Sequence, residues 1–448
     1  MVETLEKKKG SGGMIETLEE KIRTKKAKVA IIGLGYVGLP LAVGFAKKGF
    51  TVFGLDMDSK RVSQIGEGKS YILDIPSETL QGVVQNKTLR ATSEYQNVKE
   101  ADVVVICVPT PLRKSKDPDL SFVISAVQSL TPYVHKGQLV ILESTTYPGT
   151  TEEVILPLLE SGGLKTGKDF CLCFSPERVD PGNPKYHTEN ITKVVGGTTE
   201  ECSKLGKLFY EQLIQQVVVV SSPRVAEMVK LLENTFRGVN IALVNELAMM
   251  CHQLEISVWE VIEAAKTKPF GFMPFYPGPG LGGHCIPIDP IYLLWKARIH
   301  GFEVRFIELA TEINSYMPRY VVERTAEILN DVPKPLRGSR ILILGVSYKR
   351  NVNDVRESPS LEIIKLLKER GAAVSYHDSY APQLRLEEGE IMKSVPLTDE
   401  LLRTTDCVVV VTDHTLDYQK LFEKSSLIFD TRNALCNVKG KGAKIVRL

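Results

Sequence analysis

The sequence predicts an α/β protein with two Rossmann-like, doubly wound parallel-sheet domains joined by a long central helical region. Short β-branched runs alternate with helical patterns over residues 28–222 and again from residue 340. Such alternation is typical of mostly parallel sheets whose faces are covered by helices. Between these blocks, residues 225–265 carry apolar side chains at helical spacing without a proline.

Bulk composition is that of an ordinary globular protein. The 448 residues suffice for two or three domains, and 43% are hydrophobic and 25% charged. The net charge of +2 provides no basic surface for nucleic acid or membrane. No apolar run approaches the roughly 18 residues of a membrane span, and the charged N-terminus has no signal-peptide core. We therefore expect a cytoplasmic protein with no nucleic-acid or membrane partner.

The eight cysteines and seven histidines show no metal-binding spacing. The sequence has no CxxC pair and no HExxH, so we expect no metal site, and cysteines without a framework fit a reducing compartment. Cys107, Cys171, Cys173 and Cys407 fall within apolar, strand-like runs, where a small buried hydrophobe is the expected role.

Composition shifts divide the chain into four parts. Residues 1–27 form a charged extension in which Gly10-Ser-Gly-Gly13 is typical of a flexible linker. Val2-Glu-Thr-Leu-Glu-Lys7 resembles Ile15-Glu-Thr-Leu-Glu-Glu20, as an added segment or an alternative start would produce. The other parts are expected to be a dinucleotide-binding domain (28–222), a central helical and dimerisation domain with a cysteine loop (223–330) and a C-terminal ligand-binding α/β domain (331–448).

A glycine-rich turn follows the first expected strand. Residues 29–32 are apolar and largely β-branched, and Gly33, Gly35 and Gly38 then follow at GxGxxG spacing before a helical pattern and a second strand at 51–55. In such a unit the first glycine permits the tight turn, the second lets the backbone approach a pyrophosphate, and the third lets the helix pack on the strand. The pyrophosphate would lie at the helix N-terminus.

An acidic residue, Asp56, ends that second strand, about 20 residues after the first glycine. A carboxylate at this place accepts hydrogen bonds from the ribose hydroxyls and repels a 2′-phosphate, so the cofactor is expected to be NAD rather than NADP. Arg61 nearby either weakens that preference or is a solvated helix residue, and both interpretations stay open.

Five further strands are expected in this block, and the loops that follow strands carry ligand contacts in doubly wound sheets. The expected strands are 102–108, 138–142, 170–174, 193–195 and 217–220. The loops of interest are 108–111, 143–149 and 175–182.

The region 225–265 is expected to form either one long helix or two joined helices, long enough to bridge two domains and to form a dimer seam. Lys230 and Asn234 stand four residues apart in it and so share a face. The pair is either an element of a site or a solvated edge. Further helical patterns cover residues 291–300 and 308–329.

One loop presents a cysteine behind a run of glycines, Gly278-Pro-Gly-Leu-Gly-Gly-His-Cys-Ile-Pro-Ile-Asp289. Glycines let a backbone approach a ligand closely, and Cys285, with a carboxylate four residues on, has the setting of a nucleophile. The alternative is a Gly/Pro-rich turn around a buried cysteine, which is the usual fate of a free cysteine.

The second α/β block lacks a GxGxxG pattern, so we do not expect it to hold the redox dinucleotide. Its loops at 346–356 and 430–432 are basic and polar, and are either receptors for a phosphorylated ligand or plain surface turns. Its strands are expected at 340–345, 373–377, 407–412 and 427–429.

Together these motifs resemble the UDP-sugar 6-dehydrogenase family, which includes UDP-glucose and UDP-N-acetylhexosamine dehydrogenases. The resemblance covers about residues 28–440 and implies an NAD domain, a central helix at the interface of a homodimer or higher oligomer, and a C-terminal domain that closes over the UDP-sugar. The motifs are Gly33-Leu-Gly-Tyr-Val-Gly38, Ser144-Thr145 before Pro148-Gly-Thr150, Pro176-Glu177, Glu227 to Asn234, Gly282-Gly-His-Cys285 to Asp289, Lys349 to Arg356, and Asp430-Thr-Arg432.

The resemblance assigns catalytic roles residue by residue. Cys285 matches the catalytic thiol, and Lys230 and Asn234 match the pair that faces the reacting carbon. Asp289 matches the carboxylate that orders the catalytic water with the lysine. Such a cluster can take the C6 hydroxyl proton while hydride passes to NAD. Cys285 would then add to the aldehyde, giving a thiohemiacetal that yields a second hydride and becomes a thioester.

Further roles concern hydrolysis, cofactor and substrate. Glu177 matches the acid implicated in thioester hydrolysis, and Thr145 matches a residue near the nicotinamide and the water. The implied cofactor contacts are Gly33, Gly35, Tyr36, Val37, Gly38, Asp56, Met57, Arg61, Pro109, Thr110, Thr145 and Arg356. The implied substrate contacts are Glu177, Arg178, Val179, Lys230, Asn234, Phe275, Tyr276, Gly282, Tyr348, Lys349 and Arg432.

The expected substrate is UDP-N-acetyl-D-glucosamine. His284 precedes Cys285 and Ile288 precedes Asp289, at places where UDP-glucose enzymes commonly carry a small residue and a lysine. Residues 269–278 also resemble the N-acetylglucosamine branch. UDP-N-acetylmannosamine and UDP-glucose are the alternatives.

Two other classes of protein are weaker interpretations. A two-electron β-hydroxyacid dehydrogenase needs neither the cysteine loop nor a second α/β domain. A non-catalytic NAD-binding regulator would not need the intact set of Cys285, Lys230, Asp289 and Glu177.

Overall fold

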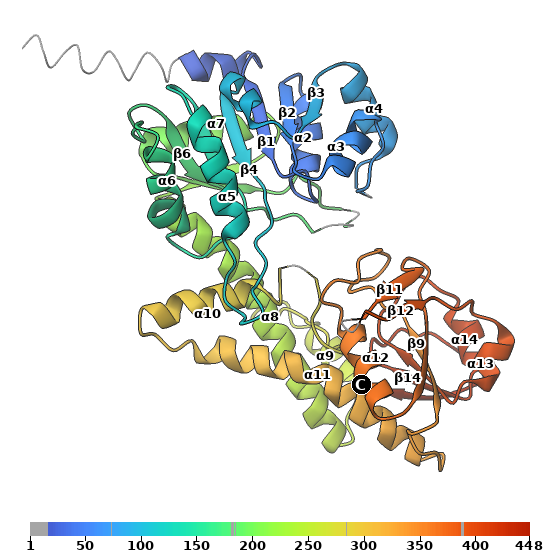
Figure 1. The fold of residues 1–448 in the computed structure, drawn as a ribbon. Coiled ribbons are helices and arrows are strands. Elements are labelled where there is room, and N and C mark those ends of the chain that lie inside the picture. The colour runs from blue at the N-terminus through green and yellow to red at the C-terminus, as the bar shows by residue number, and fades with distance from the viewer. Residues whose placement is uncertain (1–16, 73, 181–182, 184, 284, 387–388) are drawn as a thin grey trace, which may run out of the picture. The chain divides into compact units, whose positions relative to one another are not determined.

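The computed structural model describes residues 17–72, 74–180, 183, 185–283, 285–386 and 389–448. They form two compact units (Figure 1). Unit 1 runs to Glu233 and takes in Ile291–His300, and unit 2 comprises Asn234–Pro290 and Gly301–Leu448. His284, the end of the 175–182 loop and most of the N-terminal extension, on which several expectations fall, lie outside the described residues.

Unit 1 is centred on an eight-stranded sheet with the order β3-β2-β1-β4-β5-β6-β7-β8. Neighbouring strands are parallel except β6 and β7, which pair antiparallel with Phe174 opposite Gly196. The strands are β1 (Lys28–Ile32), β2 (Thr51–Leu55), β3 (Leu89–Thr92), β4 (Val103–Ile106), β5 (Leu139–Leu142), β6 (Cys171–Phe174), β7 (Lys193–Gly197) and β8 (Val217–Val220).

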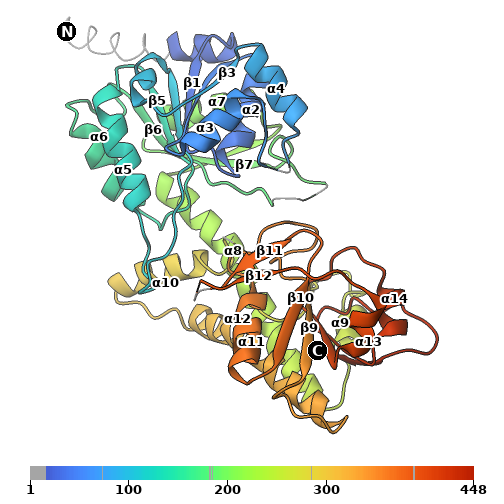
Figure 2. The same cartoon turned by 45° about the vertical axis from the view of Figure 1, so that its right-hand side comes forward.

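The central strands of this sheet are buried on both faces. In β1, Val29 and Ile31 enter one apolar layer, and Ala30 and Ile32 enter the other, because successive side chains of a strand point to opposite faces. A continuous apolar run is what such a strand requires. The first layer packs against α2 (Gly38–Lys47) and α7 (Glu200–Tyr210), and the second against α5 (Ser121–Leu130), η3 (Thr151–Ile155) and α6 (Leu156–Glu160) (Figures 1 and 2).

Shorter helices complete the cover of unit 1. They are α3 (Ser59–Gly66), α4 (Ser77–Gln85), η1 (Tyr95–Glu100) and η2 (Thr131–Tyr133).

The central helical pattern is two helices rather than one. Helix α8 (Pro223–Gln253) ends before Glu255, whose backbone has a φ of 56°. Helix α9 (Val258–Ala265) then begins at Ser257, whose side chain accepts a hydrogen bond from the backbone N–H of Glu260, as an N-cap does. Two more helices follow, α10 (Asp289–Ile299) and α11 (Arg305–Asn330).

Unit 2 is built on a five-stranded parallel sheet with the order β10-β9-β13-β14-β15. In β9, Ile341 and Ile343 enter an apolar layer with the central helices and α12 (Pro359–Glu369). Leu342 and Leu344 enter the layer that contains α13 (Asp399–Thr404) and α14 (Tyr418–Lys424) (Figure 2). The strands are β9 (Arg340–Leu344), β10 (Ala373–His377), β13 (Cys407–Val410), β14 (Leu427–Asp430) and β15 (Lys444–Arg447), with an antiparallel pair β11 (Gln383–Arg385) and β12 (Ile391–Lys393).

The predicted fold class is confirmed. Each expected strand is present, with ends that differ by one or two residues, and the sequence missed β3, β11, β12 and β15. These are edge or isolated strands with exposed positions, so their apolar runs are short. Cys171, Cys173 and Cys407 are buried as expected, whereas Cys107 is only half-buried because it follows the end of β4.

Two absences concern the described residues alone. No helix among them is both long and apolar enough to cross a membrane. Within the same residues, no group of three or more His, Cys, Asp or Glu side chains is arranged to hold a metal ion.

Candidate active site

The three glycines of the GxGxxG turn differ in how much space the surrounding protein leaves for a side chain. Gly33 has a φ of 92°, and a Cβ there would lie 2.6 Å from the backbone oxygen of Cys107. A Cβ on Gly38 would lie 1.8 Å from the backbone oxygen of Gly33. A Cβ on Gly35, in contrast, would meet no protein atom within 4 Å. The backbone at Gly35 is therefore open to a ligand, which fits a dinucleotide pyrophosphate.

Asp56, at the end of β2, stabilises this turn through hydrogen bonds. One carboxylate oxygen accepts the backbone N–H of Leu34 at 2.9 Å, and the other accepts that of Asp58 at 2.9 Å. Arg61 pairs with Asp56 at 3.3 Å. The Arg61 guanidinium therefore lies beside the carboxylate that is predicted to select NAD.

Tyr71 is a part of the turn that the sequence did not reveal. Its hydroxyl donates to the backbone oxygen of Leu34 at 2.5 Å, and the Arg61 guanidinium lies over its ring at 5.9 Å. Burial raises the pKa of the Tyr71 hydroxyl, so it remains a donor. No local pattern marks this residue, since its partner lies 37 positions earlier.

The other expected cofactor residues of unit 1 border the same edge of the sheet. Tyr36 and Met57 are exposed and Val37 precedes α2. Pro109 and Thr110 lie in the loop after β4, where the Tyr292 hydroxyl donates to the backbone oxygen of Thr110 at 3.1 Å.

A buried ionic cluster lies at the ends of β5, β6 and β7. The Lys193 ammonium is 2.9 Å from a carboxylate oxygen of Glu143 and 3.0 Å from one of Glu177. Tyr210 donates its hydroxyl to Glu143 at 2.5 Å, and the Cys107 thiol lies 3.7 Å from that carboxylate. Of these residues, sequence reasoning singled out only Glu177 for a role in the chemistry.

Glu177 is held on both of its oxygens. One accepts the backbone N–H groups of Arg178 and Val179, each at 2.7 Å, and the other accepts Lys193. Burial alone would raise the pKa of Glu177, but the charge and hydrogen bond of Lys193 and the two backbone hydrogen bonds together outweigh it, so this pKa lies below its usual value. Glu177 is therefore a carboxylate near neutral pH.

The Arg178 side chain is engaged within the protein. Its guanidinium donates to both carboxylate oxygens of Glu233 at 3.1 and 2.5 Å and to the backbone oxygen of Thr192 at 2.7 Å. Arg178 thus fastens the loop after β6 to α8. A substrate contact from this residue would have to use its backbone or displace Glu233.

Thr145 lies half-buried in a loop that α8 holds in place. The Glu227 carboxylate accepts the backbone N–H groups of Gly149 at 2.5 Å and Thr151 at 2.9 Å, and the Thr151 hydroxyl at 2.7 Å. Burial raises the pKa of Glu227 to about 7 against the opposing effect of these hydrogen bonds. A carboxylate at this place stabilises the unpaired N–H groups at the start of a helix.

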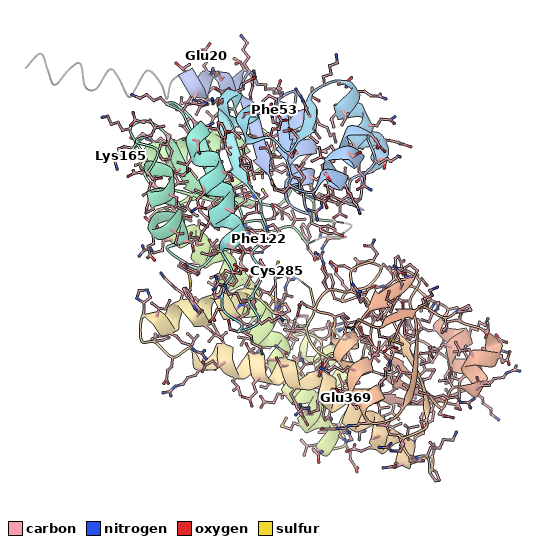
Figure 3. The ribbon with its side chains drawn as sticks, viewed as in Figure 1. Glu20, Phe53, Phe122, Lys165, Cys285 and Glu369 are labelled. Atoms are coloured by element: carbon pink, nitrogen blue, oxygen red, sulfur yellow. The ribbon has the colours of Figure 1, made fainter. Side chains whose placement is uncertain are left out.

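A short hydrogen bond joins α8 to the end of the cysteine loop (278–289). Lys230 and Asn234 are both buried on α8, and the Asn234 amide donates to Asp289 at 2.5 Å. The backbone N–H of Asp289 in turn donates to the backbone oxygen of Cys285 at 2.8 Å. Cys285 is half-buried and lies just before α10 (Figure 3), so its thiol is less enclosed than the carboxylate one turn later.

The glycines of this loop permit close packing on the loop after β9. A Cβ on Gly283, which has a φ of 87°, would lie 2.8 Å from the ring of Tyr348, and one on Gly282 would lie 2.8 Å from the Tyr348 Cβ. A Cβ on Gly278 would lie 2.4 Å from the Arg432 guanidinium. Unit 2 therefore brings Cys285, Tyr348 and Arg432, which are far apart in sequence, into one neighbourhood.

Two buried carboxamides, which the sequence did not single out, secure the loop to the central helices. Asn245 accepts the backbone N–H of Gly278 at 2.9 Å and donates to Asn314 at 2.9 Å. Asn314 donates to the backbone oxygen of Gly238 at 3.0 Å. Both side chains are buried, so the start of the loop is fixed by a continuous hydrogen-bonded chain.

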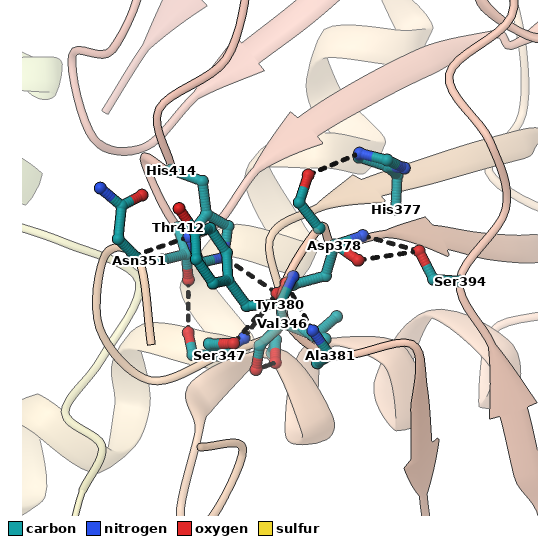
Figure 4. A network of polar contacts seen from close by, with 12 residues as sticks. Val346, Ser347, Asn351, His377, Asp378, Tyr380, Ala381, Ser394, Thr412 and His414 are labelled. Carbon is teal, nitrogen blue, oxygen red and sulfur yellow. Dashed lines mark hydrogen bonds and ion pairs between the residues drawn. The ribbon is translucent and has the colours of Figure 1, made fainter. Parts of the chain in front are cut away.

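A further polar network supports the loop that carries Tyr348 and Lys349 (Figure 4). One Asp378 oxygen accepts the backbone N–H groups of Val346 and Ser347 at 2.7 and 3.0 Å and His414 Nε2 at 2.9 Å. The backbone N–H of Asn351 donates to His414 Nδ1 at 2.9 Å. The network thus assigns the His414 proton to Nε2 and fixes both ends of the loop.

The remaining expected ligand contacts of unit 2 are held by protein partners. Arg356 donates to both oxygens of Asp354, at 2.9 and 2.7 Å, and Arg432 lies 3.5 Å from Asp413. The hydroxyl of Tyr276 donates to Glu263 at 2.9 Å. Phe275 packs edge-on against Phe236 at 5.8 Å.

An open dinucleotide turn, and a cysteine ordered beside a carboxamide and a carboxylate, define an oxidoreductase. Three consecutive segments match domains of one family: residues 27–214 its NAD binding domain, 224–316 its central domain and 342–437 its UDP binding domain. The chain belongs to the UDP-glucose/GDP-mannose dehydrogenase family. It is an NAD-dependent nucleotide-sugar dehydrogenase that acts at C6.

The chain has similar relatives along nearly its whole length. It is 37% identical over 423 residues to the UDP-N-acetyl-D-mannosamine dehydrogenase of Methanococcus maripaludis (91% of this chain, 93% of the relative). It is 37% identical over 393 residues to the UDP-N-acetyl-D-glucosamine 6-dehydrogenase of Salmonella typhi (87% and 90%). The solved structure of a UDP-D-ManNAc dehydrogenase from Pyrococcus horikoshii matches with a TM-score of 0.85 at 33% identity (94% and 98%).

Proposed function

We propose that this protein oxidises C6 of a UDP-N-acetylhexosamine to the carboxylate in two two-electron steps. The observation that carries the proposal is the Asn234–Asp289 hydrogen bond one helical turn from Cys285. It supports the proposal because, within unit 2, Asp289 would serve as the proton acceptor and Asn234 as the oxyanion donor for the half-buried thiol of Cys285. Two NAD molecules, bound one after the other, would each accept one hydride, and the open turn at Gly35 together with Asp56 would hold the cofactor.

The chain's own residues divide the work of the reaction. Lys230 and Asp289 manage the C6 hydroxyl proton through a water molecule. The Cys285 thiolate adds to the aldehyde carbon, and Asn234 and Lys230 donate to the oxygen that becomes anionic. Loss of the second hydride leaves a thioester on Cys285, and attack by water frees the thiol and the sugar acid. Glu177 and Thr145 serve that hydrolysis.

The UDP moiety is proposed to bind the C-terminal domain, residues 331–448. Tyr348, Lys349 and Arg432 lie on loops after β9 and β14, and loops after parallel strands are where ligands bind in doubly wound sheets. Arg432 rests on Asp413, so a diphosphate would exchange one anionic partner for another. The cofactor correspondingly belongs to residues 28–222.

The proposed sugar is UDP-N-acetyl-D-glucosamine, from the residues beside Cys285 and Asp289. The manno epimer is the second candidate, because similar relatives carry both names. Purified protein is given NAD and, in separate assays, UDP-N-acetylglucosamine, UDP-N-acetylmannosamine or UDP-glucose. We expect it to oxidise one of the two UDP-N-acetylhexosamines and to release two NADH per molecule of that sugar. One NADH and a free aldehyde would refute the thioester route, and turnover of UDP-glucose alone would refute the N-acetylhexosamine.

A homodimer or higher oligomer is also proposed. Exposed apolar side chains recur along α8 at helical spacing, which is unusual for a surface in contact with water. Gel filtration with light scattering should give at least twice the mass of one chain, and Leu232→Asp is expected to reduce it. The residues are Val225, Met228, Leu232, Phe236, Leu243 and Met250.

A further inference from the structure

We propose that Lys193 is a positioning residue that holds the Glu177 carboxylate ionised and correctly oriented to take the proton of the water that hydrolyses the thioester. The inference rests on the proposed function, since it concerns the step that would follow oxidation at Cys285. The contacts of Lys193 on which it rests all lie within unit 1.

The geometry leaves Lys193 little freedom. It is the first residue of β7, and its side chain is 5% exposed. Its ammonium lies between two carboxylates, 2.9 Å from Glu143 and 3.0 Å from Glu177. The ring of Tyr210 lies below it, with the ammonium 5.2 Å from the ring centroid. A buried lysine is costly unless it is paired in this way.

Hydrogen-bond capacity identifies the oxygen of Glu177 that can accept a proton. Oε1 accepts two backbone N–H groups, which uses both of its lone pairs. Oε2 accepts only Lys193 among the described groups, which leaves it one lone pair. Lys193 therefore both fixes the carboxylate plane and presents the oxygen that remains basic.

The pKa values of the two carboxylates of the cluster are shifted in opposite directions. Burial raises the pKa of Glu143 despite the opposing effect of Lys193, whereas at Glu177 the effect of burial is outweighed by Lys193 together with two backbone N–H groups, so that pKa is lowered. Pairs of acids whose surroundings separate their pKa values in this way have distinct proton-transfer roles. Glu143 is the second carboxylate in contact with Lys193, and Glu177 is the base.

The other charged and titratable groups around Glu177 do not replace Lys193. The Arg178 guanidinium is taken by Glu233 from α8. Burial raises the pKa of both the Cys107 thiol and the Tyr210 hydroxyl, so these two groups are neutral donors. Lys193 is therefore the cation in contact with Glu177 within the described residues.

The test uses three variants, because Lys193→Met alone would leave Glu143 buried without its cation. The double variant Lys193→Met/Glu143→Gln removes both charges at once and is the main test, since neutral replacements of a buried pair are tolerated. Glu143→Gln keeps the Lys193–Glu177 contact and is the matched control. Lys193→Arg keeps a cation and is the rescue variant.

Each variant is given NAD and the UDP-N-acetylhexosamine that the parent protein oxidises. The readouts are the amount of covalent adduct on Cys285 and the time course of NADH release. The double variant should release two NADH per site rapidly and then turn over about 100-fold more slowly, with the thioester adduct visible by intact mass. The pH profile of its kcat should shift to higher pH on the acid side. Glu143→Gln and Lys193→Arg should not accumulate the adduct.

The outcomes separate the two levels of proposal. A parent protein that releases one NADH per sugar refutes the proposed function itself. The role of Lys193 is refuted if the parent protein releases two NADH per sugar and the folded double variant hydrolyses its thioester at the parent rate. It is also refuted if the double variant is slowed before the first hydride transfer. Adduct accumulation in Glu143→Gln would also refute it, since that variant retains the Lys193–Glu177 contact.

Discussion

The side-chain amide of Asn234 donates to the carboxylate of Asp289 at 2.5 Å, and both residues are buried. The bond joins the middle of α8 to the first turn of α10, 55 residues further along the chain. Because Asp289 also donates its backbone N–H to the backbone oxygen of Cys285, the Asn234 amide connects α8 to the cysteine loop through Asp289.

Replacing the Asn234 amide by a second carboxylate should make the stability of this contact depend on pH. In Asn234→Asp the two acids share one buried site, which raises their joint pKa above the value of about 3.9 for a free aspartate. Stability is then retained at low pH and lost as pH rises through the raised pKa. We expect Tm to fall by about 5–10 °C at pH 8 and by clearly less at pH 5.

The matched control is the exchanged pair Asn234→Asp/Asp289→Asn. It restores one amide and one carboxylate, so Tm should recover while activity, which needs the carboxylate beside Cys285, should not. An equal loss of Tm at both pH values in Asn234→Asp, measured by differential scanning fluorimetry, would contradict the electrostatic explanation.

Two glycines of the NAD turn should respond in opposite ways to alanine. Gly35→Ala meets no protein atom, so Tm should stay within about 2 °C of the parent because a Gly→Ala change without strain is mildly stabilising. KM for NAD should nevertheless rise at least about tenfold, since the methyl group occupies the path of the pyrophosphate. Gly38→Ala places a Cβ 1.8 Å from the oxygen of Gly33 and should lower Tm by several degrees.

Steady-state kinetics with NAD varied and thermal unfolding of the same preparations will distinguish these cases. If Gly35→Ala leaves KM for NAD unchanged, the cofactor does not pass over this backbone.

Glu227 should make stability depend on pH. Its pKa is raised from 4.5 to about 7 in the folded protein, so the folded state holds a proton that the unfolded state has lost between these pH values. Stability from this group is complete below about pH 4.5 and falls as pH rises to about 7, by about 1.4 kcal/mol per pH unit at most. Urea unfolding of the parent and of Glu227→Gln should be compared at pH 5 and pH 8. The free energy of unfolding of the variant relative to that of the parent should be higher at pH 8 than at pH 5. A constant difference would show that Glu227 is ionised throughout.

His414 should affect substrate binding without touching the substrate. It connects Asp378 to Asn351 and thereby fixes the loop of Tyr348 and Lys349. His414→Ala leaves buried partners unpaired and should raise KM for the UDP-sugar about tenfold, with little change in KM for NAD. His414→Asn retains an acceptor near the place of Nδ1 and should recover part of the loss. Equal effects on both KM values would indicate general destabilisation instead.

Local patterns were sufficient for the fold class and for the two most distinctive loops. The strand-and-glycine turn at residues 29–38 and the cysteine loop at 278–289 are contiguous, and glycine spacing, strand alternation and helical period are properties of neighbouring residues. The same reasoning could not decide between one and two central helices, because the break at Glu255 depends on a single positive φ.

Tertiary structure decided which groups act on one another. Lys193 meets Glu143 and Glu177 because β7, which is antiparallel to β6, begins beside the carboxyl ends of β5 and β6. Tyr71 reaches the NAD turn, and Asn245 and Asn314 secure the cysteine loop, through partners 33 to 69 residues away. A hydrogen bond depends on distance in space, and a single sequence records no spacing for groups brought together by different strands and helices. The sequence by itself therefore determined the fold class and the two distinctive loops, whereas the folded chain determined which charges and hydrogen bonds surround them.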